Sequence, residues 1–371
     1  MDAGRKRELE GKVYAGARLS RADGEALYTA DDLVWLGRLA HHRRAGQGSD
    51  QVLFAVERRL TLAGTGPVDE TVRRATELAA DGVTGLHLVG PPHPGLPWEH
   101  YPDLLRALRA ALPDVELTAF AATDVHRLEE QTGRTADEIL DELVDAGLAS
   151  LTGGGAEIFD QEVRAQLAVH DCGWADWVRI HRAAFARGIG APATMRYGHL
   201  EEPRHRVDHL LRLREVQDET GGFATFVPLR HRHDVADPAA GGPGAGQSER
   251  SVPAERSVAT SPAASLRTFA VSRLLLDNVP HLTACWATHG FPVAQLSLGF
   301  GADDLAGSAA APQVVDDADP FPEPTRDALL DLIRDADLRP VERDTRYAVV
   351  REFDAPPSLA ERRAVPQRVW A

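Results

Sequence analysis

The sequence predicts an α/β protein of the (β/α)8 TIM-barrel-like type, because short apolar runs alternate with helical segments along most of the chain. The apolar runs are rich in β-forming residues and lie at residues 52–57, 84–90, 115–121, 148–152, 191–197, 223–229 and 281–287. Repeated strand–helix–strand units produce parallel strands. No G-x-G-x-x-G pattern follows the first run, which weighs against an open dinucleotide-binding sheet. A barrel with an eighth strand near residues 297–302 fits better.

The segments between and around these runs complete the predicted organisation. Helices are expected from Pro67 onward and over residues 101–112, 135–146, 174–187 and 203–220. Residues 1–50 form an N-terminal helical arm, residues 51–353 form the barrel, and residues 354–371 form a loose tail. Residues 236–262 are rich in Pro, Gly, Ser and Ala and predict a mobile surface loop. A helix near 327–335 and a strand over 346–352 form a C-terminal segment that closes the barrel.

Composition excludes several classes of function. The 371 residues include 41 Lys+Arg and 56 Asp+Glu, a net charge of −15, which disfavours nucleic acid as a partner. No apolar stretch is long enough to cross a bilayer and the first residues are charged, so we expect no membrane span and a cytoplasmic location. Cys172 and Cys285 are the two cysteines and lie far apart, which excludes an all-cysteine metal site within one chain.

Catalytic candidates come from the carboxyl ends of the strands, where barrel enzymes place their active sites. His199 and Glu201 follow the fifth strand, and Asp124 and His126 follow the third. Each pair joins an imidazole to a carboxylate and could act as an acid–base pair.

Binding candidates lie at the same ends. Gly153, Gly154 and Gly155 could offer backbone N–H groups to a carboxylate or phosphate, or could simply form a turn with positive φ. Glu157 could hold ribose hydroxyls or an ammonium, or could be solvated. The further candidates are His93, Tyr197 and Arg230.

No metal site is predicted from the histidines. His205 and His209 have helical spacing but lack the glutamate of H-E-x-x-H, and anion binding beside Arg230 is the better use of His231 and His233.

Long blocks of the chain resemble the aminofutalosine (aminodeoxyfutalosine) synthases, radical S-adenosylmethionine (SAM) enzymes of the futalosine route to menaquinone. The blocks occur in the family's order and include GARLSRADGEALY (16–28), HPGLPW (93–98), DELVDAGLASLTGGGAEIFDQEVR (141–164), YGHLEEPRHRVDHLLRLREVQDETGGF (197–223), TFAVSRLLLDNVPH (268–281) and GADDLAGS (301–308).

This resemblance implies a radical-SAM type barrel that binds SAM and 3-[(1-carboxyvinyl)oxy]benzoate and adds the adenosyl radical to the vinyl group. It also implies a [4Fe–4S] cluster held by Cys-x3-Cys-x2-Cys after the first strand. Residues 52–75, VLFAVERRLTLAGTGPVDETVRRA, contain no cysteine, and Thr61 and Thr65 are poor iron ligands. The chain also departs from the family at 90–93, Gly-Pro-Pro-His, and at 308–319.

From this departure we expect a cluster-less, radical-inactive paralogue that keeps part of the pocket and acts in ligand binding or regulation. Its ligand would be a small aromatic carboxylate or a nucleoside, with SAM as a candidate and a menaquinone-pathway enzyme as a candidate partner. Two alternatives stay open. One is a genuine aminodeoxyfutalosine synthase whose cluster ligands come from elsewhere or whose gene lost a segment. The other is a non-radical enzyme that acts on the same ligands.

Overall fold

The computed structural model of the chain describes residues 1–45, 50–62, 67–79, 82–167, 172–231, 260–307 and 324–354. Within these residues, no helix has the length and apolar character needed to span a membrane. Most of the segment predicted as a loop, the final tail and residues 308–319 lie outside the described residues, as do His233 and Thr65.

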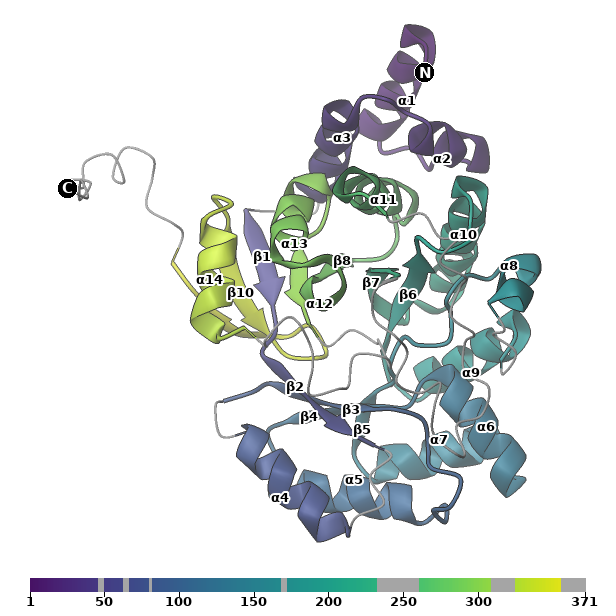
Figure 1. The fold of residues 1–371 in the computed structure, drawn as a ribbon, viewed down its shortest axis with the longest axis vertical. Helices are drawn as coiled ribbons and strands as arrows, with labels where there is room; N and C mark the ends of the chain where they lie inside the picture. The colour runs from purple at the N-terminus through teal and green to yellow at the C-terminus, as the bar shows by residue number, and fades with distance from the viewer. Residues whose placement is uncertain are drawn as a thin grey trace, which may run out of the picture.

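Parallel strands form the centre of the fold (Figure 1) and confirm the predicted α/β barrel type. They follow one another in the order β2 (Glu57–Thr61), β3 (Gly85–Val89), β4 (Glu116–Ala119), β5 (Leu148–Ser150), β6 (Ala191–Tyr197), β7 (Phe223–Arg230), β8 (His281–Cys285) and β9 (Asp304–Ala306). A single parallel bridge between Ser150 and Gly190 connects β5 with the β6 side of the arc.

The first strand differs from the prediction, which placed one strand over 52–57. The chain forms β1 (Gln51–Phe54), which pairs with β9 on one side and with β10 (Arg339–Arg343) on the other. It then bends at residues 55–56 and continues as β2, which pairs with β3. The barrel wall therefore has a seam between β9 and β2.

The eighth strand was predicted too early in the chain. Residues 297–302 hold the end of α13 (Phe291–Ser297) and a 3-10 turn over Leu298–Phe300, and the strand is β9 at Asp304–Ala306. Gly301, with φ +98°, ends the helical turn in a conformation that side chains rarely adopt, and only then can the chain extend.

Helices cover the outside of the strands. They are α4 (Val68–Ala79), α5 (His100–Ala111), α6 (Ala122–Thr132), α7 (Ala136–Asp145), α8 (Gln161–Gln166), α9 (Trp174–Ala186), α10 (Pro203–Thr220), α11 (Pro262–Leu275), α12 (Trp286–His289) and α14 (Arg326–Arg334). Periodicity predicted all of them except α6, α8, α11 and α12. Ser261 caps α11 through a bond from the Ala264 N–H, so the segment predicted as a loop over 236–262 ends where this helix begins.

Residues 1–45 form three helices, α1 (Ala3–Tyr14), α2 (Arg21–Tyr28) and α3 (Leu33–Ala45). They pack against α10 and α11 and share one hydrophobic core with the barrel (Figure 1). Gly37 lets α3 approach the Phe300 ring, because a Cβ there would lie 2.8 Å from a ring carbon. The arm therefore belongs to the barrel's packing, although the division at residue 50 itself stays a prediction.

A hairpin seals the barrel at the amino ends of the strands. It consists of β10 (Arg339–Arg343), which the sequence analysis missed, and β11 (Val349–Glu352), shorter than the strand predicted over 346–352. Arg343 forms two hydrogen bonds to Asp304, of 2.9 and 2.7 Å, and the Tyr347 hydroxyl lies 3.0 Å from the same carboxylate. The hairpin side chains thus lie at the amino ends of the strands, opposite the carboxyl ends at which barrel enzymes place their active sites.

Candidate functional site

The connection after β2 is the place where the resemblance described above implies a [4Fe–4S] cluster. Only residues 62–67 separate β2 from α4, and their sequence, Leu-Ala-Gly-Thr-Gly-Pro, contains no thiol. A Cys-x3-Cys-x2-Cys motif is eight residues long, whereas this connection has six residues. The connection is therefore too short for the motif, and it also lacks the cysteine ligands.

The two cysteines lie elsewhere. Cys172 is buried ahead of α9, where burial raises the pKa of its thiol to about 12. Cys285 is buried at the end of β8, and burial raises the pKa of its thiol too. No group of three His, Cys, Asp or Glu side chains in the described ranges could hold a metal ion. The residues present therefore do not fit a [4Fe–4S] cluster.

The glycine turn after β5 is fixed by close packing. A Cβ on Gly153 would lie 2.5 Å from the Pro192 carbonyl oxygen. Buried Arg164 donates to the carbonyls of Gly155 and Ala156, at 3.3 and 3.1 Å. Trp177 donates to the Gly154 carbonyl at 3.4 Å. The turn thus needs glycine for its packing, and the anion-cradle role of its N–H groups stays a prediction.

Glu157 is paired rather than solvated. Its carboxylate lies 2.7 Å from Nε of Arg196, and its backbone oxygen accepts a 2.7 Å bond from the Arg196 N–H. Both side chains are about nine-tenths buried, and Glu157 has φ +43°, a strained conformation for a residue with a side chain. Such strain is common at ligand sites, but the ribose or ammonium role predicted for Glu157 is untested.

The loop after β6 brings His199 and Glu201 together, as the sequence analysis paired them. His199 Nδ1 lies 3.0 Å from the Glu201 carboxylate, and both side chains are almost fully buried. Glu201 also accepts the N–H groups of Gly198 and His199, at 2.6 and 2.9 Å, and a 2.8 Å bond from Nε of Arg206.

These contacts determine the charge of Glu201. Burial alone would raise the pKa of its carboxyl, but the His199 ring, Arg206 and the Gly198 N–H outweigh burial and lower it to about 2. His199 Nε2 faces the Arg196 carbonyl at 3.0 Å. The pair therefore holds the loop together, and its acid–base role stays a prediction.

Tyr197 and Arg230 contact the segment after β8. The Tyr197 hydroxyl lies 2.8 Å from Nε2 of His289, and burial raises the pKa of Tyr197. Arg230 donates through Nε to the Thr288 carbonyl at 3.1 Å. Sequence reasoning missed His289, although its place directly after a strand in CWATHG was a usable signal.

The other candidates, Asp124, His126 and His93, have contacts within their own segments. Asp124 accepts the Ala121 N–H at 2.8 Å and caps α6, which starts directly after β4, so the segment predicted as a polar loop is helical. His126, two residues further along α6, lies 3.6 Å from Glu129. His93 accepts the Gly95 N–H within its own turn, at 3.0 Å.

The helical histidines have structural roles. His209 is fully buried, stacks on Phe159 at 4.1 Å between ring centroids, and contacts the Thr194 carbonyl at 2.8 Å. Burial lowers the pKa of its ring to about 3. His205 accepts the Glu202 N–H at 3.0 Å at the start of α10. Both rings are engaged by atoms of the chain itself, and the absence of a zinc site at these two residues stays a prediction.

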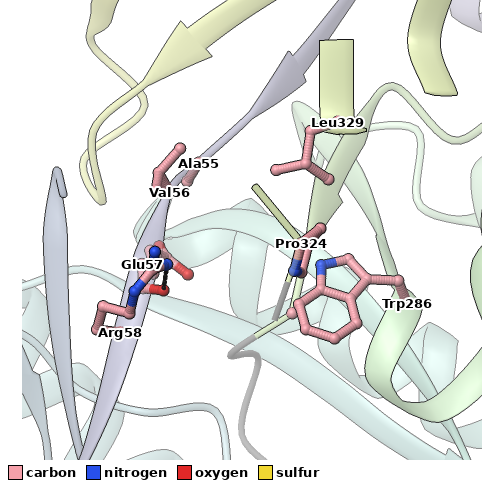
Figure 2. Close-up of a pocket in the computed structure, with 8 residues that line it drawn as sticks. Ala55, Val56, Glu57, Arg58, Trp286, Pro324 and Leu329 are labelled. Carbon is pink, nitrogen blue, oxygen red and sulfur yellow. Dashed lines mark hydrogen bonds between the residues drawn. The ribbon is translucent and has the colours of Figure 1, made fainter. Parts of the chain in front are cut away.

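A shallow depression, open to solvent, lies at the barrel seam (Figure 2). The Trp286 ring forms one wall, Glu57 and Arg58 of β2 lie opposite, and Leu329 of α14 lies above (Figure 2). Gly307 also borders it, and a Cβ there would overlap the Trp286 ring. None of the site residues predicted from the sequence lines this depression.

A family model and two curated relatives show which proteins this chain is similar to. Residues 250–355 match the family described as the CofH/MqnC C-terminal region. The chain is 50% identical to the aminodeoxyfutalosine synthase of Streptomyces coelicolor, with all of both chains covered. That alignment has 393 positions, 22 more than the 371 residues of this chain. The aminodeoxyfutalosine synthase of Thermus thermophilus is 36% identical over 92% of this chain and 95% of its own.

Solved structures support the fold. The FeFe-hydrogenase maturase HydG from Carboxydothermus hydrogenoformans superposes with a TM-score of 0.66 at 14% identity, covering 92% of this chain and 81% of its own. Methylornithine synthase (PylB) gives a TM-score of 0.62 at 14% identity, covering 87% of this chain and 95% of its own. At such identities the similarity concerns the fold alone.

Proposed function

Because this chain belongs to the aminodeoxyfutalosine synthase family, we propose that it acts in the futalosine route to menaquinone on the ligands of that reaction. Those ligands are 3-[(1-carboxyvinyl)oxy]benzoate and SAM. The observation that carries the proposal is an identity of 50% spread over the full length of both chains. The barrel closed at its amino ends, with polar side chains at its carboxyl ends, is a suitable scaffold for such small ligands.

The first candidate function is aminodeoxyfutalosine synthase activity itself. The sequence analysis favoured a cluster-less paralogue instead, but the comparisons favour the synthase, since two proteins of that name align over more than nine-tenths of this chain. The cysteines of this chain do not fit the cluster, so we assign no radical step to its residues. Synthase activity would require cluster ligands from outside the chain, or from a gene segment that this sequence lacks.

The second candidate function is binding of the same ligands without radical chemistry. One specific observation favours it, namely the six-residue connection after β2 that contains no cysteine. The residues that would orient a ligand are then those at the strand ends, including Arg196 with Glu157 and Arg230.

Anaerobic reconstitution of the purified chain with iron and sulfide separates the two candidates. With a small thiol such as glutathione supplied as the outside ligand, the synthase candidate predicts about one cluster per chain, visible absorbance, and adduct formation when SAM, the ether and a reductant are added. The binding candidate predicts no bound iron and no adduct while the ether still binds. Absence of iron, adduct and ether binding together would contradict the proposed function.

A further inference from the structure

A row of polar side chains crosses three neighbouring strands of the barrel at one level. Arg59 on β2 pairs with His87 on β3, and His87 pairs with Thr118 on β4, in unbroken register. Thr118 also lies opposite Ser150 on β5, where the register between β4 and β5 shifts. Residues paired in register in a parallel sheet present their side chains to the same face. Figure 1 shows these four strands side by side.

The row faces the barrel interior. The residues that flank it along the strands are buried apolar side chains of the core beneath the outer helices: Leu60, Leu86, Leu88, Leu117 and Ala119. Since side chains alternate along a strand, the row points the other way. A second observation agrees. Burial raises the pKa of the Cys285 thiol, but the positive charge of Arg59 acts on it in the opposite direction, which places that charge near the end of β8.

Two polar atoms of the row are buried and have no hydrogen-bond partner among the residues that the structure describes. They are Nδ1 of His87 and Oγ1 of Thr118, on adjacent strands. The other ring nitrogen of His87 lies 3.4 Å from the Glu57 carboxylate, so the ring is held from one side. The Ser150 hydroxyl is bonded to the Gly190 carbonyl at 2.9 Å. Buried polar atoms without partners are uncommon and costly, so two neighbouring ones need an explanation.

We propose that Arg59, His87 and Thr118 form a subsite inside the barrel for a carboxylate group of the ligand. The guanidinium supplies the positive charge, the Thr118 hydroxyl donates a hydrogen bond, and His87 Nδ1 provides a second polar contact. The identity of the ligand as the benzoate ether rests on the proposed function. The preference for a carboxylate rests on these three side chains.

Thr118→Val is the most informative variant, because valine keeps the shape of threonine and removes only the unpartnered hydroxyl. We expect its stability in urea to equal or exceed that of the wild type, since no existing bond is lost. We expect binding of the benzoate ether, measured by isothermal titration calorimetry, to weaken roughly tenfold or more, the usual cost of losing a hydrogen bond to a charged group. Arg59→Gln should weaken it at least as much.

Thr225→Val provides the matched control. Thr225 is also a buried threonine, but its hydroxyl is bonded to Thr283 at 2.7 Å at the amino end of the barrel. This variant should lose stability and bind the ether like the wild type. Benzoate and the neutral benzamide serve as ligand controls, and only benzoate should bind.

The outcomes separate the subsite from the proposed function. Equal ether binding by wild type and Thr118→Val, or equal binding of benzoate and benzamide, overturns the subsite and leaves the proposed function standing. Binding of benzoate that Thr118→Val weakens, without binding of the ether, supports the subsite and contradicts the proposed function. A wild-type chain that binds neither carboxylate overturns both.

Discussion

Replacing Glu201 by Gln tests whether its buried carboxylate stabilises the loop after β6. The ordinary pKa of this carboxyl, which applies in the unfolded chain, is 4.5, and the contacts of the folded chain lower it to about 2. Since one pKa unit corresponds to about 1.4 kcal/mol, the ionised carboxylate contributes about 3 kcal/mol to the free energy of unfolding at pH 7. Leaving Arg206 buried without its partner has a cost of similar size, about 3 to 5 kcal/mol.

The lowered pKa of Glu201 also determines how the free energy of unfolding depends on pH. Because the folded-state pKa is the lower one, the stabilisation is present above pH 4.5 and is lost as the pH falls toward 2. Roughly 2 of the 3 kcal/mol should be gone by pH 3. Glu201→Gln, which carries no titrating carboxyl, should therefore be about 3 kcal/mol less stable than the wild type at pH 7 and about 1 kcal/mol less stable at pH 3.

Urea unfolding followed by circular dichroism at pH 7, 4 and 3 measures this difference. Glu202→Gln is the matched control, because Glu202 is the next residue and pairs with Arg204 at an exposed site. Its effect should stay within about 0.5 kcal/mol at every pH. A Glu201→Gln variant that behaves like this control, with a difference from wild type independent of pH, would refute the reasoning.

Three further predictions concern packing and reactivity. Gly153→Ala should destabilise the chain by about 1 to 3 kcal/mol, because its Cβ would lie 2.5 Å from the Pro192 oxygen, whereas Gly173→Ala, with open space around it, should cost less than half as much in the same urea assay. Tyr347→Phe should cost about 1 to 3 kcal/mol, since it removes the hydroxyl that contacts Asp304 and Thr283 at 3.0 Å; an unchanged unfolding midpoint would contradict the role of the hairpin. Both cysteines are buried and their thiol pKa values are raised, so Ellman's reagent at pH 8 should titrate no thiol in the native chain and two in urea; rapid native labelling would show that one of them is accessible.

Sequence periodicity predicted the barrel because its strands are short apolar runs separated by amphipathic helices. It failed where tertiary pairing decides the structure. Nothing local shows that the chain bends at residues 55–56, because β1 pairs with β9 and β10 while β2 pairs with β3. The three-residue strand β9 begins with Asp304, whose charge is stabilised by Arg343 from a distant strand.

The candidate site was predicted in part. Reading the residues after each strand found His199, Glu201 and Glu157, but not their partners Arg206 and Arg196, because ion pairing depends on which elements pack together. The interior row was missed for a different reason. His87 and Thr118 lie within strands dominated by apolar residues, and only the register of β3 and β4 shows that the two share a face.

The most direct test of the proposed function is isothermal titration calorimetry of the full-length chain with 3-[(1-carboxyvinyl)oxy]benzoate. We predict one binding site per chain with micromolar affinity, because the chain belongs to the aminodeoxyfutalosine synthase family along its whole length. No detectable binding at millimolar ether, with a chain shown to be folded by circular dichroism, would contradict the account.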